Sequence, residues 1–256
     1  MDVPNFEGLR GIAMNRMQAA TRYAGIMAIT VLISATVSVS RAYPEAYIGG
    51  QFGTTIAGNK LSHVDLTDFS PPGTMSDRSL SPSPLIGLKI GYYFPRARWF
   101  GLETEAYHMT PHIRHQPTTI SIPNGAVLRD FGPVAGGTSQ GTLTGDHFRV
   151  ITFVPVNLMF RYYKTRLQPY FGFGPGVFMG RVTTTIPQFA GTQSSTRIGL
   201  NAKAGGEYFF TRHLSGFAEV KYNYARFDFS GNTNGGFSYR ATYNPVILAV
   251  GLSYHF

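Results

Sequence analysis

Residues 217–224 read FAEVKYNY, and from Ala218 onward apolar side chains alternate with polar or charged ones. Glu219, Lys221 and Asn223 share one parity, while apolar and aromatic residues occupy the positions between them. Successive side chains of a β-strand point to opposite faces. The alternation therefore predicts a strand with one charged face and one uncharged face.

Seven other segments alternate in the same way, at residues 46–56, 86–94, 100–108, 148–162, 169–179, 198–210 and 246–256. A tilted strand needs about 9–11 residues to cross a bilayer, and each segment has roughly that length or more. An even number of antiparallel strands can close into a barrel. The sequence therefore predicts an all-β fold, an eight-stranded antiparallel β-barrel.

The distribution of charge between the two faces predicts which face meets lipid. A soluble barrel points its charges outward and lines its cavity with apolar groups. Here one face carries all the charged residues of the eight segments, and the other carries none. We expect the uncharged face to contact lipid, in a transmembrane β-barrel, and the charged face to line the lumen. A soluble β-sandwich is the alternative.

Neighbouring strands should bring opposite lumen charges together as an ion-pair network that comprises Lys89, Glu103, Glu105, Arg149, Arg161, Lys203, Glu207, Glu219 and Lys221.

The connections between the segments differ in length. Links around residues 95–99, 163–168 and 211–213 are short, whereas 57–84 and 109–147 are long and 180–197 and 226–242 are intermediate. Short periplasmic turns and long extracellular loops are typical of outer-membrane barrels. We expect residues 118–131 to form a protruding hairpin around the turn signal Pro-Asn-Gly at 123–125. Aromatic residues beside the short turns predict an interfacial girdle of Tyr92, Phe94, Trp99, Phe100, Tyr162, Phe210, Tyr254 and Phe256.

The N-terminal residues have the features of a secretory signal. Arg10, Arg16 and Arg22 precede an uncharged stretch at 23–40, and Ala42 offers a small residue at the expected cleavage site. We therefore expect residues 1–42 to be a cleaved signal peptide and residues 43–256 to be the barrel domain. An uncleaved anchor helix is the alternative.

The overall composition excludes several function classes. The 256 residues include no Cys, which excludes disulfide scaffolds, thiolate metal sites and cysteine nucleophiles. Lys and Arg number 22 against 13 acids, but basic residues gather at the short turns, where anionic headgroups could meet them. We expect no nucleic-acid partner. No dinucleotide or Walker-type glycine motif occurs, and we expect no cofactor.

The segments that carry the pattern resemble the small outer-membrane β-barrel family, which includes the OmpA-like and opacity-type eight-stranded proteins. They are AYIGG at 46–50, LETE at 102–105, VNL at 156–158, QPYFGFG at 168–174, AGGEY at 204–208, FAEVKY at 217–222 and VGLSYHF at 250–256. The resemblance implies residence in the outer membrane. The implied partners are outer-membrane lipid, lipopolysaccharide, an unknown extracellular ligand at the loops and, during insertion, the barrel-assembly machinery. The aromatic end, with Tyr254 and Phe256, is similar to the C-terminal assembly signal of such barrels.

We therefore expect a non-enzymatic structural or surface-interaction scaffold with a side-chain-filled lumen. A small porin-like channel is the alternative. Some relatives in the family modify lipid A, so a barrel enzyme is a minor alternative. It would have to draw on His108, His112, His115 and His147 with Ser121, Ser139 and Asp146 near the outer rim. His112 and His115 could bind a metal only weakly, because two ligands without a third make a poor site.

Overall fold

The computed structural model describes residues 46–143, 146–184, 191–231 and 237–256. The predicted signal peptide at 1–42 lies outside the described residues. No helix within these ranges is long and apolar enough to cross a membrane.

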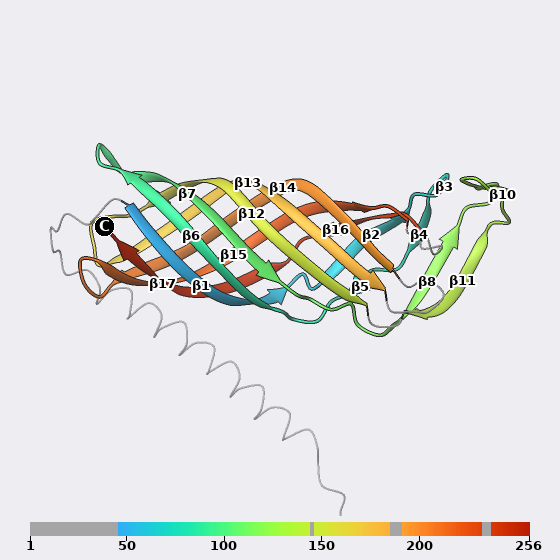
Figure 1. Ribbon diagram of the computed structural model, residues 1–256, viewed down its shortest axis with the longest axis horizontal. Coiled ribbons are helices and arrows are strands. Elements are labelled where there is room, and N and C mark those ends of the chain that lie inside the picture. The colour runs from blue at the N-terminus through green and yellow to red at the C-terminus, as the bar shows by residue number, and fades with distance from the viewer. Residues whose placement is uncertain (1–45, 144–145, 185–190, 232–236) are drawn as a thin grey trace, which may run out of the picture.

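Eight strands of the described residues form a closed antiparallel ring (Figure 1). In ring order they are β1 (Ala46–Ala57), β6 (Pro84–Phe94), β7 (Ala97–Met109), β12 (His147–Arg161), β13 (Leu167–Thr184), β14 (Gly191–Phe209), β15 (Leu214–Phe229) and β17 (Val246–His255). Pairing of β17 with both β15 and β1 closes the barrel. The predicted number and direction of the strands are confirmed.

Burial alternates along the barrel strands with the apolar side chains outward. On β6, Ile86, Leu88 and Ile90 are 66%, 61% and 60% exposed, whereas Lys89 between them is 4% exposed. In water this arrangement would expose a large apolar surface and bury charge, both of which are unfavourable. The outer wall of the barrel is therefore suited to lipid, as the sequence predicts.

The alternation changes phase once, within β12. In the first half of this strand the even-numbered side chains are buried, whereas from Asn157 to Arg161 the odd-numbered ones are. The ladders to β7 and β13 both shift register across residues 153–158, around Pro155. Proline has no N–H for the ladder, and a bulge that inserts one extra residue reverses the faces beyond it. Arg149 therefore lies on the exposed outer face, which corrects its predicted place in the lumen.

Two of the predicted loops are largely strand. β13 and β14 stay paired out to Thr184 and Gly191, so most of the predicted link at 180–197 extends the barrel wall. β15 continues to Phe229 and there pairs with β16 (Tyr239–Tyr243). The barrel is therefore longer at the loop end than the alternation of apolar residues predicts.

The long loops fold into a sheet that continues from the barrel, seen at the end opposite the C-terminus in Figure 1. This region, which we call the platform, comprises β16, β2 (Lys60–Leu66), β3 (Phe69–Ser70), β4 (Gly73–Met75), β5 (Arg78–Ser79), β8 (Gln116–Ile122), β9 (Val127–Leu128), β10 (Gly132–Pro133) and β11 (Gly137–Leu143). From β15 the order of its main sheet is β16, β2, β4, β8 and β11.

The predicted hairpin at 118–131 is wrong in its pairing. β8 pairs with β11, whereas β9 pairs with β10 and β3. The turn itself is present, because Ala126 donates a backbone hydrogen bond to Pro123 at 3.2 Å. Leu128, which follows this turn, packs against the apolar core beneath the platform. Residues 127–133 therefore pair with one another and with β3 rather than with β8.

An apolar cluster fills the barrel at its loop end, and we call it the outer core. Its side chains come from the upper parts of the barrel strands and from the platform. They are Leu61, Val64, Leu66, Phe69, Leu80, Ile113, Phe148, Val150, Phe178, Val182, Ala225, Phe227, Phe229, Tyr239, Ala241 and Tyr243. The outer core joins barrel and platform into one packed body.

Candidate functional site

Six buried charges meet in the lumen, three lysines and three glutamates from four strands. They are Lys89 (β6), Glu103 and Glu105 (β7), Lys203 (β14), and Glu219 and Lys221 (β15). Each lysine contacts two glutamates and each glutamate contacts two lysines, so the side chains form a closed ring of alternating sign. We call it the ion-pair ring.

The contacts around Lys89 and Lys203 form one half of the ring. Lys89 Nζ lies 4.0 Å from a Glu103 carboxylate oxygen and 3.4 Å from one of Glu219. Lys203 Nζ also contacts Glu103 and lies 3.2 Å from Glu105. Glu103 therefore joins a lysine of β6 to a lysine of β14.

Lys221 completes the ring. Its Nζ contacts Glu105 and lies 3.1 Å from Glu219. Lys203 and Lys221 are direct cross-strand partners of like charge, so neighbouring strands do not supply the opposite charge here. Both ammonium groups instead reach across the lumen to Glu105. The expectation that adjacent strands pair opposite charges therefore holds for Lys89 of β6 and Glu103 of β7. It is wrong for Lys203 and Lys221, since the lumen is narrow enough for side chains to span it.

Neutral groups complete the coordination of the carboxylates. Tyr47 donates a hydrogen bond to Glu103 Oε2 at 2.6 Å, and Tyr170 donates one to Glu219 Oε2 at 2.6 Å. Asn157 Nδ2 donates to Glu105 Oε1 at 3.2 Å. Buried charge is tolerated where it is paired and its remaining lone pairs accept hydrogen bonds. With three charges of each sign, the ion-pair ring is neutral as a whole.

A second polar layer lies nearer the short turns. His255 Nε2 lies 2.9 Å from Glu207 Oε1, and Ser215 donates to the same oxygen at 2.6 Å. The His255 ring stacks on Tyr47 with centroids 5.3 Å apart. Because Tyr47 also binds Glu103, this layer is linked to the ion-pair ring.

Arg161 lies in the same part of the lumen. Its guanidinium covers the ring of Tyr93 at 3.6 Å from the centroid, and its Nε donates to the Arg98 carbonyl at 2.9 Å. A guanidinium over an aromatic face gains cation–π attraction when little water reaches it.

An amide and tyrosine layer covers the other side of the ion-pair ring. Tyr107 donates to Asn223 Oδ1 at 2.8 Å, and Asn201 Nδ2 donates to the same oxygen at 2.8 Å. Beyond it, buried Met109 and Ile247 lead to the outer core. From the turn end to the loop end, the described lumen thus contains four layers: the Glu207–His255 layer, the ion-pair ring, the amide and tyrosine layer, and the apolar outer core.

Eight of the nine predicted lumen residues are buried in the barrel interior, and six of them form the ion-pair ring. Glu207 and Arg161 lie in the layer beside it, and Arg149 lies outside. The sequence reasoning left out His255, Tyr47 and Tyr170. The alternation of side chains along each strand could have placed them in the interior. His255, for example, lies on the same face of β17 as the buried Ser253.

Of the rim residues considered for chemistry, the structure brings the rings of His112 and His147 together. His147 Nδ1 lies 3.2 Å from His112 Nδ1, and Asp146 accepts a hydrogen bond from the last residue of β13. Ser121 and Ser139 lie on β8 and β11, and among the described side chains no hydrogen bond joins a serine hydroxyl to the imidazole of His112 or His147. A nucleophilic serine needs such a base within hydrogen-bond reach. The described residues contain no group of three His, Asp or Glu placed to hold a metal.

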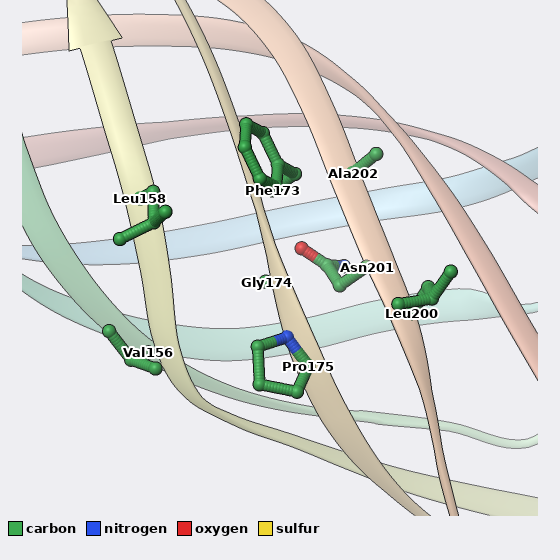
Figure 2. A pocket seen from close by; sticks show the side chains of 8 residues that line it. All are labelled: Val156, Leu158, Phe173, Gly174, Pro175, Leu200, Asn201 and Ala202. Atoms are coloured by element: carbon green, nitrogen blue, oxygen red, sulfur yellow. The ribbon is translucent and has the colours of Figure 1, made fainter.

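An open apolar pocket of about 410 Å³ lies on the outward face, beside the β12 bulge (Figure 2). Val156 of β12, Phe173 and Pro175 of β13, and Leu200 of β14 line it. Asn201 is the single polar side chain among its eight lining residues. The pocket can hold an apolar chain and offers no acid or base for chemistry.

Aromatic rings surround the turn end of the barrel. Tyr254 and Phe256 are 50% and 68% exposed, with ring centroids 5.4 Å apart. Phe256 donates its backbone N–H to the Ala46 carbonyl at 3.0 Å, which ties the last residue to the start of β1. Trp99 and Tyr162 are also exposed at this end. Tyrosine and tryptophan favour the boundary between lipid and water.

Comparison with known proteins yields one family. The model of the outer membrane protein beta-barrel domain matches residues 26–256. No curated protein matches the sequence significantly. The solved structures similar to the chain include the Neisserial surface protein A (14% identity, TM-score 0.46, 84% of this chain and 100% of the other). They also include OprG from Pseudomonas aeruginosa (16% identity, TM-score 0.47, 84% of this chain and 98% of the other). A third is Ail of Yersinia pestis, solved with the heparin analogue sucrose octasulfate (12% identity, TM-score 0.41, 83% of this chain and 99% of the other).

Proposed function

Because this chain belongs to the outer membrane protein beta-barrel domain family, we propose that it is a closed surface scaffold, whose filled barrel carries a folded platform for interactions outside the cell. The protein is a small β-barrel of the bacterial outer membrane. Its role as a scaffold rests on the packing of its lumen.

The observation that supports this proposal most strongly is the succession of packed layers across the lumen. An eight-stranded barrel has an interior just wide enough for side chains to fill. Here the six residues of the ion-pair ring are at most 4% exposed, and the outer core lies above them. A passing ion would have to displace paired charges and then cross an apolar layer, which is costly.

The platform supports the second part of the proposal, that the protein takes part in interactions outside the cell. In outer-membrane barrels the short turns face the periplasm and the longer loops face the outside. The same orientation here presents the platform to the surroundings of the cell. Its last strand, β11, pairs only with β8 among the described strands, and the side chains of Thr138, Ser139 and Gln140 are exposed. The free edge therefore offers backbone hydrogen-bonding groups to a partner.

Lysine labelling of intact cells tests this orientation. Lys60 on the platform has a side chain 51% exposed, and Lys164 is exposed in the turn between β12 and β13. A membrane-impermeant amine reagent should modify Lys60 on intact cells and Lys164 only after the envelope is opened. Lys60→Arg and Lys164→Arg variants identify the two products. Labelling of Lys164 on intact cells, with Lys60 protected, would overturn the proposal.

A further inference from the structure

Arg149 and Arg181 face each other across the β12–β13 ladder as direct cross-strand partners. Both side chains are exposed on the outer wall of the barrel. Directly opposite residues of an antiparallel pair have Cβ atoms about 4.5–5.5 Å apart, and like charges at such positions repel each other. Two positive charges are therefore held together on the outer wall.

We propose that this arginine pair binds the phosphate groups of an outer-leaflet glycolipid. The neighbouring residues define its depth in the membrane. The next outward pair towards the barrel middle is Ile151 with Met179, and both side chains are partly exposed and apolar. The next pair towards the loops is His147 with Thr183, which is polar. The arginine pair therefore lies at the outer edge of the apolar wall, where lipid headgroups begin.

Two other exposed arginines near the loop end have carboxylate partners. Arg226 lies 3.2 Å from Asp65, and Arg197 lies 3.3 Å from Asp228. Neither Arg149 nor Arg181 has an ion pair with a carboxylate in the described part of the chain. An external anion bound between them would offset their repulsion.

Phosphate on a lipid suits this position better than phosphate in solution. Each guanidinium can donate two parallel hydrogen bonds to phosphate oxygens, so two neighbouring arginines can hold one or two phosphates. The acyl chains of the same molecule would lie along Ile151 and Met179. His147 and His112, whose Nδ1 atoms are 3.2 Å apart, add polar ring nitrogens on the loop side. The bulge around Pro155 is what turns Arg149 outward to complete the pair.

Thermal unfolding of the full barrel in a neutral detergent provides the test. The additives are diphosphorylated lipid A, dephosphorylated lipid A and inorganic phosphate. The variants are Arg149→Gln, Arg181→Gln and the double substitution, and Arg226→Gln is the matched control because its arginine is already paired. Heat-modifiable gel mobility verifies that each variant is folded.

Diphosphorylated lipid A should raise the unfolding temperature of the wild type and of Arg226→Gln, while the other two additives have little effect. The apparent affinity for diphosphorylated lipid A should fall about tenfold or more in the double variant, because charge-assisted hydrogen bonds are lost. Without lipid, the double variant should unfold at a higher temperature than the wild type, since the repulsion is gone. Unchanged affinity in the double variant would overturn the proposal. An equal effect of inorganic phosphate would instead indicate a soluble anion and also overturn it.

Discussion

Glu105 on β7 and Lys221 on β15 form a buried ion pair between strands on opposite sides of the eight-stranded ring. Three strands separate β7 from β15 in either direction around the barrel. The contact therefore crosses the lumen rather than following a ladder, and it holds the two halves of the wall together. Lys203 contacts the same carboxylate at 3.2 Å. Glu105 is thus shared by two lysines.

Glu105→Gln should destabilise the barrel strongly. The substitution keeps the shape of the side chain but removes the negative charge that Lys203 and Lys221 share. Breaking one partner of a buried ion pair typically costs about 3–5 kcal/mol, because the other charge stays buried. Urea unfolding in micelles, followed by heat-modifiable gel mobility, measures the free energy of unfolding. Lys60→Gln is the control, because it breaks an exposed pair with Asp77, and such pairs contribute only about 0–1 kcal/mol. Equal losses in both variants would mean that the lumen charges are solvated.

Removing both partners should cost less than the sum of the single losses. The Glu105→Gln, Lys221→Met double variant removes both charges of the pair, so neither charge stays buried without its partner. We expect a coupling energy of about 0.5–3 kcal/mol from the double-mutant cycle. Additive losses would show that the two groups do not interact in the folded barrel.

Tyr47→Phe should lower the free energy of unfolding by about 1.5–3 kcal/mol, because Glu103 loses a hydrogen bond to a charged oxygen. Tyr162→Phe serves as the control, since Tyr162 is 52% exposed at the turn end. The same unfolding measurement applies to both. A loss in Tyr162→Phe as large as in Tyr47→Phe would contradict the role given to the buried hydroxyl.

Gly91→Ala should destabilise the barrel at least as much as Tyr47→Phe. A Cβ at Gly91 would overlap the ring of Tyr47, so the ring and its hydroxyl must move away from Glu103. Gly50→Ala is a matched control on the neighbouring strand, because a Cβ there has no neighbour within 4 Å. If the two alanine variants have the same free energy of unfolding, the ring of Tyr47 does not pack over Gly91.

The sequence predicts the barrel well because period-2 patterning and the one-sided placement of charge depend only on local strand geometry. It fails at Pro155, where a bulge of one residue reverses the faces of β12 and places Arg149 outside. It also misses the pairing of β8 with β11, because the local turn signal at 123–125 does not determine which strand pairs with β8.

The candidate site is predictable in composition but not in its pairing. Parity alone assigns Lys89, Glu103, Glu105, Lys203, Glu219 and Lys221 to the interior. Which lysine meets which glutamate depends on strand stagger and side-chain reach across the lumen. The like-charged neighbours Lys203 and Lys221 show that nearest-strand reasoning cannot supply the answer.

Single-channel recording in planar bilayers tests the closed lumen most directly. The wild type should give no steady open-pore current, because the ion-pair ring and the outer core both fill the lumen. Glu105→Gln should also remain closed, since the outer core, with Phe148, Phe178 and Phe227, is unchanged by the substitution. A steady ohmic current through the wild type would contradict the account and indicate a small channel.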